Sequence, residues 1–197
     1  LINAQLMYSY IWNIVDGDNF SGVHFISPNF YYMHKKFGLT RVYYTYKSTN
    51  NWQFDSRDTG QHSAGINQFF FLAKQKGRIK LAYEFAEDNA VGSAFDRNIH
   101  NFSLKAKTPL FFGIDLDAEG KYSIRSYDTR LADNAVDERQ DDQQRYTVKL
   151  SRVLYKELGI LEKLTFYTKY RHTLNKTNLD IREYKSNRVD VGLRGIF

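Results

Sequence analysis

The sequence predicts an all-β chain whose strands run up and down beside one another in antiparallel order, and three patterns support this. Apolar and polar residues alternate at period two in segments of roughly ten residues, the spacing of a strand with one apolar and one polar face. Short and longer connections alternate between these segments. The chain also ends on an aromatic residue, Phe197. Together these patterns are typical of an antiparallel up-and-down transmembrane β-barrel, with apolar side chains toward lipid and polar ones toward the lumen.

About ten such segments follow one another, and the last one, 188–197, is the clearest. The segments are 6–14, 23–34, 40–47, 64–72, 79–85, 102–107, 114–125, 146–151, 164–171 and 188–197. The second is the least regular, and Pro28 predicts a bulge or strand break there because proline cannot donate a ladder hydrogen bond. Phe69 and Phe71 interrupt the alternation of the fourth.

The connections between the segments predict how the strands lie in the membrane. Short turns are predicted at 35–38, 75–77, 108–113 and 156–161. Longer polar connections are predicted after Val15 and at 50–61, 88–97, 128–143 and 175–186. Outer-membrane barrels have short periplasmic turns and longer outer loops, so both termini are expected on the periplasmic side.

The composition is consistent with one barrel domain spanning residues 1–197. Aromatic residues make up 16% of the chain, with 15 Tyr and 15 Phe, as expected of aromatic girdles at two membrane interfaces. The mean hydropathy is negative, but only alternate residues of a barrel strand need be apolar. The chain has no Cys, which excludes disulfides and thiolate metal sites. The net charge of +6 does not indicate nucleic acid, because the basic residues are interspersed strand by strand instead of clustered.

Alternation alone does not decide which face points inward. A soluble up-and-down barrel, such as a lipocalin, would have the same pattern with an apolar interior. The unequal connections and the terminal Phe197 favour the membrane barrel. The ten strands could form a whole barrel or the C-terminal part of a larger one, and an open edge in lipid is untenable.

The polar faces of the strands predict a charged, net basic lumen. Antiparallel neighbours should bring Asp115, Asp117 and Glu119 beside basic rows, so cross-strand ion pairs are expected. Rings of Arg and Lys favour anionic permeants, and a basic constriction is expected from Lys163, Lys169, Arg171, Arg188 and Arg194. The full set of predicted lumen-lining residues is Lys105, Lys107, Asp115, Asp117, Glu119, Lys121, Arg125, Arg145, Lys149, Lys163, Lys169, Arg171, Arg188, Asp190 and Arg194.

No catalytic, cofactor-binding or metal site is predicted. His62 and Ser63 are adjacent, so on a strand they point to opposite faces and cannot act as base and nucleophile. The acidic stretch at 133–142 could hold Ca²⁺ through its carboxylates, but it lacks EF-hand spacing, and a solvated charge run is the preferred interpretation. The histidines are interpreted as scattered, without metal-ligand spacing.

Four segments in the second half of the chain support a family resemblance. They are T-P-L-F-F-G-I-D-L-D-A at 108–118, R-Y-T-V-K-L-S-R-V-L at 145–154, L-T-F-Y-T-K-Y-R-H-T-L-N-K-T-N at 164–178 and Y-K-S-N-R-V-D-V-G-L-R-G-I-F at 184–197. They resemble the C-terminal barrel region of Gram-negative outer-membrane proteins that carry periplasmic tetratricopeptide repeats, of the exopolysaccharide export porin or surface-protein assembly modifier type.

The resemblance implies a setting and partners. It implies an outer-membrane barrel in contact with the lipid bilayer and lipopolysaccharide, and a periplasmic repeat domain or envelope complex as partner. The terminal Phe197 matches the signal by which the barrel-assembly machinery recognises its clients. The chain has no repeat region, so we expect that Leu1 is not the native start.

Three functions follow from these patterns. The leading one is a channel or export conduit whose basic lumen favours anionic solutes or polymers. The alternative is a plugged structural or docking barrel that anchors an envelope complex, because a ten-stranded barrel is narrow. Its lumen would be packed by Tyr43, Phe69, Phe71, Tyr127 and Tyr167. The third, an outer-membrane enzyme of the lipase kind, is disfavoured by the lack of a suitable His and Ser pair.

Overall fold

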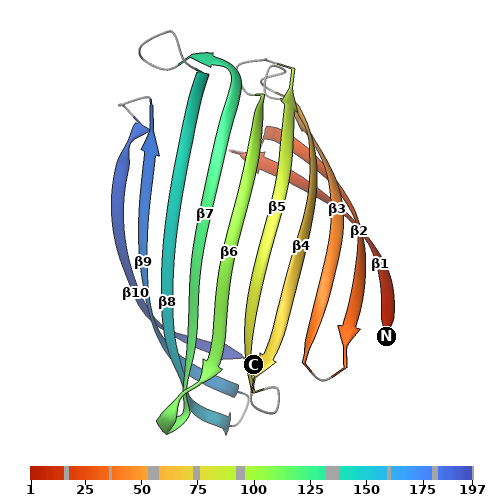
Figure 1. The fold of residues 1–197 in the computed structure, drawn as a ribbon. Coiled ribbons are helices and arrows are strands. Elements are labelled where there is room, and N and C mark those ends of the chain that lie inside the picture. The colour runs from red at the N-terminus through yellow and green to blue at the C-terminus, as the bar shows by residue number, and fades with distance from the viewer. Residues whose placement is uncertain are drawn as a thin grey trace.

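A computed structural model describes residues 1–15, 18–35, 37–52, 58–72, 76–91, 96–131, 138–158, 161–178 and 182–196. The strands are β1 (Ile2–Val15), β2 (Asp18–His34), β3 (Gly38–Asn51), β4 (Thr59–Leu72), β5 (Gly77–Ala90), β6 (Arg97–Pro109), β7 (Ile114–Leu131), β8 (Glu138–Leu158), β9 (Leu161–Thr177) and β10 (Tyr184–Ile196), with one 3-10 turn, η4 (Phe111–Gly113). All ten lie in one sheet in chain order, each antiparallel to the next (Figure 1). The predicted all-β up-and-down fold is therefore confirmed.

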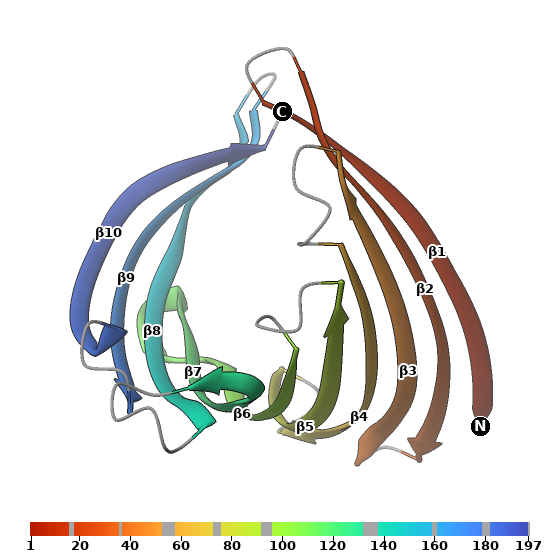
Figure 2. The same ribbon diagram turned by 90° about the horizontal axis from the view of Figure 1, so that it is seen from above.

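The sheet curls into an incomplete barrel. Seen from above, the strands follow a deep curve from β1 on one side to β10 on the other (Figure 2). Among the described strands, β1 is hydrogen-bonded to β2 and β10 to β9, and no pairing joins β1 to β10. Phe197, the predicted assembly signal, lies outside the described residues.

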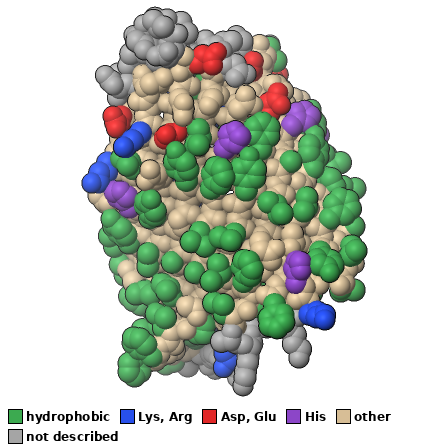
Figure 3. Space-filling model, in the orientation of Figure 1, with side chains coloured by type: hydrophobic (Ala, Val, Ile, Leu, Met, Phe, Trp, Pro, Cys, Tyr) green, Lys and Arg blue, Asp and Glu red, His purple; other side chains and the backbone are tan. Residues whose placement is uncertain are grey.

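Burial is inverted relative to a soluble protein. Among the described residues, the buried side chains comprise twelve polar or charged residues but only three apolar ones, Ala86, Ile99 and Tyr127. Large apolar residues are instead exposed on the convex face, and on the side that Figure 3 shows the charged side chains lie toward the upper and lower margins. Ser27 and Asn29, which point into the concave side, are 1% and 0% exposed. The polar face therefore points inward, and the soluble-barrel alternative is not supported.

Pro28 does not break its strand. β2 runs unbroken from Asp18 to His34, so the predicted bulge or break is wrong. The ladder to β3 omits the pairs at Ser27 and Pro28 but resumes in the same register. Ser27 compensates, because its hydroxyl donates to the carbonyl of Tyr44 at 2.9 Å and lies 3.0 Å from the hydroxyl of Thr45. A side chain thus replaces the hydrogen bond that the backbone of proline cannot donate.

Several predicted loops are shorter than the sequence pattern indicated. β2 begins at Asp18, so only two residues separate it from β1, and the predicted long first connection is wrong. β7 continues to Leu131 and β8 begins at Glu138, so much of the predicted 128–143 loop is strand. Strand pairing extends beyond the apolar segments because polar residues also form ladder hydrogen bonds. Alternation of side chains between faces therefore continues into the acidic stretch.

A contact from a tyrosine hydroxyl to a side chain of the next strand, which we call the tyrosine clasp, recurs in five hairpins, always on the convex face: β1–β2, β3–β4, β5–β6, β7–β8 and β9–β10. In β5 and β6, the hydroxyl of Tyr83 lies 3.0 Å from Nδ1 of His100. His100 pairs directly with Phe85, two residues beyond Tyr83. The same offset joins, in the other hairpins, Tyr8 to His24 (3.0 Å), Tyr44 to His62 (2.5 Å), Tyr122 to Asp142 (3.2 Å) and Tyr170 to Asn187 (2.8 Å).

These clasps correct the interpretation of the histidines as scattered. His24, His62, His100 and His172 each stack or tilt against one or two aromatic rings of neighbouring strands. Tyr and His have an apolar body and a polar tip, which suits the boundary between hydrocarbon and water. The pattern was not visible from spacing in the sequence, because the partners come together only through strand register.

The clasp makes a testable contribution to stability. The variant Tyr83→Phe should lower the free energy of unfolding by about 1 kcal/mol, because it leaves the apolar ring in place but removes one hydrogen bond. The measurement is denaturant unfolding of the refolded chain in detergent micelles. Tyr32→Phe is the matched control, since within the described residues the Tyr32 hydroxyl has no hydrogen-bond partner. Equal losses in both variants would contradict a role for the clasp.

Candidate functional site

All of the predicted lumen residues lie on the concave face. The ladder places Lys107 opposite Asp117, Glu119 opposite Lys105 and Asp190 opposite Lys169, and residues directly opposite share a face. Residues two positions apart on one strand also share a face, so the remaining predicted residues of β6 to β10 lie on the concave face as well.

Part of this face forms a hollow between β6 and β9. Its volume is about 320 Å³. The hollow is lined by Lys105, Asp117, Glu119, Lys121, Arg145, Thr147, Lys149, Lys169 and Arg171. Six of these side chains are basic and two are acidic. We call this set of nine residues the basic hollow.

Cations face cations across the ladder at the basic hollow. Lys121 pairs directly with Arg145, and Lys149 with Lys169. Arg171, on the margin of the hollow, pairs with Arg188 on β10. Like charges directly opposite each other destabilise an antiparallel sheet. Three such pairs on consecutive strand pairs make this region of the wall electrostatically unfavourable by itself.

The predicted cross-strand ion pairs do form, but they leave part of the hollow uncompensated. Nζ of Lys105 lies 3.1 Å from Asp117 and 3.7 Å from Glu119, and Nζ of Lys169 lies 3.6 Å from Asp190. Both acidic residues of the hollow thus face Lys105. Among the described residues, Lys121, Arg145 and Arg171 have no ion pair. The Nε atoms of Arg145 and Arg171 are buried and have no hydrogen-bond partner there.

The opposite part of the wall is nearly neutral. β1 carries no charged residue in its fourteen positions, and β4 carries none apart from His62 on the outer face. The concave side of these strands is uncharged: it carries Asn3, Gln5, Met7, Ser9, Ile11 and Asn13 on β1, and Thr59, Gln61, Ser63, Gly65, Asn67, Phe69 and Phe71 on β4. The positive charge of the lumen is therefore concentrated on β6 to β10.

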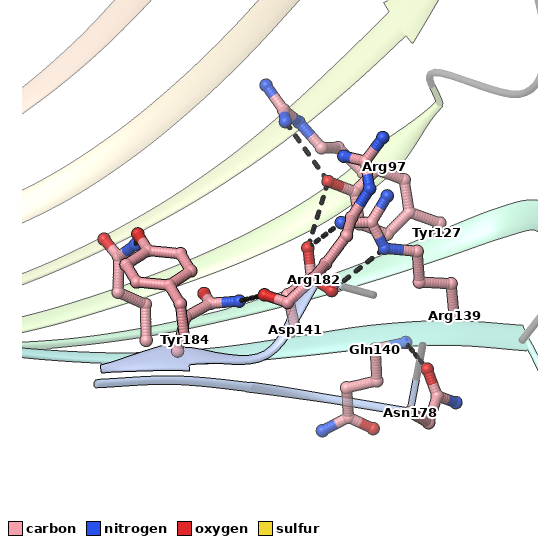
Figure 4. A network of polar contacts seen from close by, with 10 residues as sticks. Arg97, Tyr127, Arg139, Gln140, Asp141, Asn178, Arg182 and Tyr184 are labelled. Carbon is pink, nitrogen blue, oxygen red and sulfur yellow. Dashed lines mark hydrogen bonds and ion pairs between the residues drawn. The ribbon is translucent and has the colours of Figure 1, made fainter. Parts of the chain in front are cut away.

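A second polar cluster lies toward the longer connections and is charge-balanced. Asp141 forms an ion pair with Arg139, and both side chains are almost fully buried (Figure 4). Tyr127 lies beneath Arg139, whose guanidinium is 4.4 Å from the ring centroid, and its hydroxyl donates to Asp141 at 3.5 Å. Arg97 pairs with Asp88 at 2.6 Å and also reaches Tyr127. We call these five residues the rim network.

The rim network was missed by sequence reasoning for a clear reason. Asp141 and Asp142 fall in a stretch interpreted as a solvated charge run, but Asp141 is buried, so that interpretation is wrong for it. The two carboxylates lie on opposite faces of β8, Asp142 beside Tyr122 and Asp141 beside Arg139. They cannot share one ion. Three further carboxylates were considered for Ca²⁺: Glu138 is exposed at the start of β8, and Asp133 and Asp137 lie outside the described residues.

Only some of the residues predicted to form a basic constriction lie close together. Lys169 and Arg171 line the basic hollow, whereas Lys163 and Arg194 lie nearer the short-turn end. Arg188 is exposed and pairs with Asp190 at 2.7 Å. Of the remaining predicted residues, Arg125 lines a smaller pocket beside the rim network, and Lys107 and Asp115 lie toward the short turns.

The one adjacent His and Ser pair considered as a catalytic candidate is divided between the two faces of β4. His62 is on the outer face beside Tyr44, and Ser63 is buried on the inner face, as predicted. No group of three or more potential metal ligands occurs among the described residues. Within those residues, no helix is long and apolar enough to cross a membrane.

Comparisons with known proteins give little further information. No protein-family model matches the chain, and no curated protein matches it. Among solved structures, the chain is similar to the beta domain of the Bordetella autotransporter BrkA. The identity is 11%, the TM-score is 0.40, and the match covers 96% of this chain and 82% of that chain. A likeness this distant does not transfer a function. The resemblance to repeat-linked porins stays a prediction.

The rim network should be essential for stability. Asp141→Asn should lower the free energy of unfolding by about 3 kcal/mol, because it leaves the buried guanidinium of Arg139 without a counter-charge. Denaturant unfolding in micelles measures the loss. Asp142→Asn, one residue away but on the outer face, is the matched control and should cost less than about 1 kcal/mol. A similar small loss for both would mean that the buried pair adds no stability.

Proposed function

We propose that this chain forms the wall of an outer-membrane conduit in a Gram-negative envelope, with a net basic lumen that favours anionic solutes or polymers. The observation that carries the proposal is the inverted burial: polar side chains are enclosed, while residues such as Leu6, Val42 and Val191 are 68%, 49% and 64% exposed. Lipid is the surrounding that such a convex face fits, because water would leave a large apolar surface unburied.

The inner aromatic residues support a conduit over a plugged barrel. Tyr43 lies directly over Gly65, its cross-strand partner: a Cβ atom at Gly65 would come within 2.5 Å of the ring. Tyr167 lies over Gly192 in the same way, with 2.8 Å to its hydroxyl. The hydroxyl of Tyr43 donates to Glu84 on β5 at 2.6 Å, which holds the ring along the wall. Rings that lie against glycine take up little of the lumen.

A conduit in lipid also requires closure. The backbone groups on the free edges of β1 and β10 would cost several kcal/mol each in hydrocarbon if unpaired. β1 is well suited to pairing, since it has no charge and no proline, the features by which edge strands usually avoid further pairing. In the proposed state both edges are therefore paired.

Anion preference is tested in planar bilayers with the purified chain. The proposal expects conductance with an anion to cation permeability ratio above one. Lys149→Gln with Lys169→Gln should lower that ratio at least about twofold, because two charges of the basic hollow are removed. Lys47→Gln, on the concave face of β3, is the control for charge removal elsewhere and should change it less. Conductance without anion preference, or none at all, would contradict the proposal.

The glycine beneath Tyr43 gives a separate test of the open lumen. Gly65→Ala should displace the tyrosine ring from the wall, because the added methyl group occupies its position. Single-channel conductance should fall, while the permeability ratio stays the same because no charge changes. Gly120→Ala, where a Cβ atom meets Tyr146 at an ordinary 3.7 Å, is the control. Unchanged conductance in Gly65→Ala would count against an open lumen along β3 and β4.

A further inference from the structure

We infer that the basic hollow is a binding site for a polyanion: a ligand, or a segment of one, that carries several negative charges on oxyanion groups such as phosphate or sulfate. The inference rests on the proposed conduit function and adds to it a specific, saturable site. An anion-selective pore needs only a diffuse excess of positive charge. The hollow instead concentrates that charge at one place on the wall.

The charge count favours a multivalent ligand. The hollow has six basic side chains, Lys105, Lys121, Arg145, Lys149, Lys169 and Arg171, and two acidic ones, Asp117 and Glu119. The difference is four positive charges. Asp190, from β10, pairs with Lys169 and reduces the excess to three. A single monovalent anion would leave most of this charge uncompensated, whereas a group such as a triphosphate would neutralise it.

The cations lie directly opposite one another in the ladder, an arrangement that does not stabilise the sheet. Some ladder positions of the same wall pair opposite charges directly, as Lys105 does with Glu119 and Lys107 with Asp117, so the fold can place counter-charges across the ladder. At Lys121 with Arg145, and at Lys149 with Lys169, it places cations instead. Because such pairs lower stability, an occupant that relieves their repulsion would bind with a gain in stability.

Unused hydrogen-bond donors point to the same occupant. The Nε atoms of Arg145 and Arg171 are buried and unpartnered among the described residues. Such donors usually find an acceptor, and guanidinium groups match the oxygens of phosphate and carboxylate. The rim network differs in its counter-charges: Arg139 and Arg97 form ion pairs with Asp141 and Asp88, and Nη1 of Arg139 is buried without a hydrogen-bond partner among the described residues. The hollow, at about 320 Å³, is at the small end of ligand sites, which suits a compact polyanion or a short polymer segment.

The test is thermal unfolding of the refolded full chain in detergent micelles, titrated with sodium tripolyphosphate at constant ionic strength. We expect the midpoint to rise by roughly 5 to 10 °C at a concentration a hundredfold above Kd. Sodium chloride at the same ionic strength should give no saturable shift. Isothermal titration calorimetry under the same conditions should show one site. Absence of both the shift and the heat would overturn the inference.

Substitutions of basic residues in the hollow test whether tripolyphosphate binds there. Lys121→Gln with Arg145→Gln should raise the midpoint without ligand, since repulsion is removed, and abolish the shift with tripolyphosphate. Lys47→Gln should keep the shift. If the double variant does not refold, Arg171→Gln is titrated by calorimetry instead and should weaken binding at least about tenfold. A shift that survives these changes would overturn the assignment.

Two further measurements distinguish a polymer segment from a free small polyanion, and the proposed binding site from the proposed conduit. Long-chain polyphosphate that binds more tightly than tripolyphosphate at equal phosphate concentration supports a polymer segment as the occupant, and equal or weaker binding supports a free small polyanion. Bilayer conductance distinguishes the two proposals. Anion preference without tripolyphosphate binding would contradict the binding site but not the conduit. Binding that depends on the basic hollow, without conductance, would support the binding site and contradict the conduit.

Discussion

The two-residue alternation of an antiparallel ladder is the constraint on which the other features depend. Because neighbouring strands keep their register over most of their length, a side chain on one strand has a fixed partner on the next. The tyrosine clasps use this directly, since all five join residues at one diagonal offset on the convex face. The tyrosine rings over Gly65 and Gly192 use the direct pairing on the concave face. Local side-chain chemistry thus follows from register.

The enclosed polar face is organised in two different ways. Toward the longer connections, the rim network pairs two arginines with two aspartates around Tyr127, which satisfies buried charge and holds β5 to β8 together. Nearer the middle, the basic hollow sets cations opposite cations and, among the described residues, leaves Lys121, Arg145 and Arg171 without an ion pair. A wall that needed only to be stable could use the first arrangement throughout. The second is what a site for an anionic ligand requires.

The convex and concave faces together explain the unusual aromatic content. Outer tyrosines and histidines form the clasps, where a polar tip meets an apolar band. Inner tyrosines lie flat against glycine or beneath arginine, as Tyr167 and Tyr127 do. The same residue type thus forms hydrogen bonds between strands on the convex face and lies flat along the wall on the concave face.

The sequence by itself determined the strands, their order and the set of residues that share a face, because alternation and turn residues are local properties of the chain. It also correctly placed His62 and Ser63 on opposite faces. It did not determine where strands end, as Asp18 and Glu138 show, since ladder pairing extends into polar segments. Only the tertiary structure decided that the polar face is enclosed, that Asp141 is buried beside Arg139, and that Lys121 faces Arg145. Curvature sets burial and long-range register sets partners, and neither is encoded in the period of a single strand.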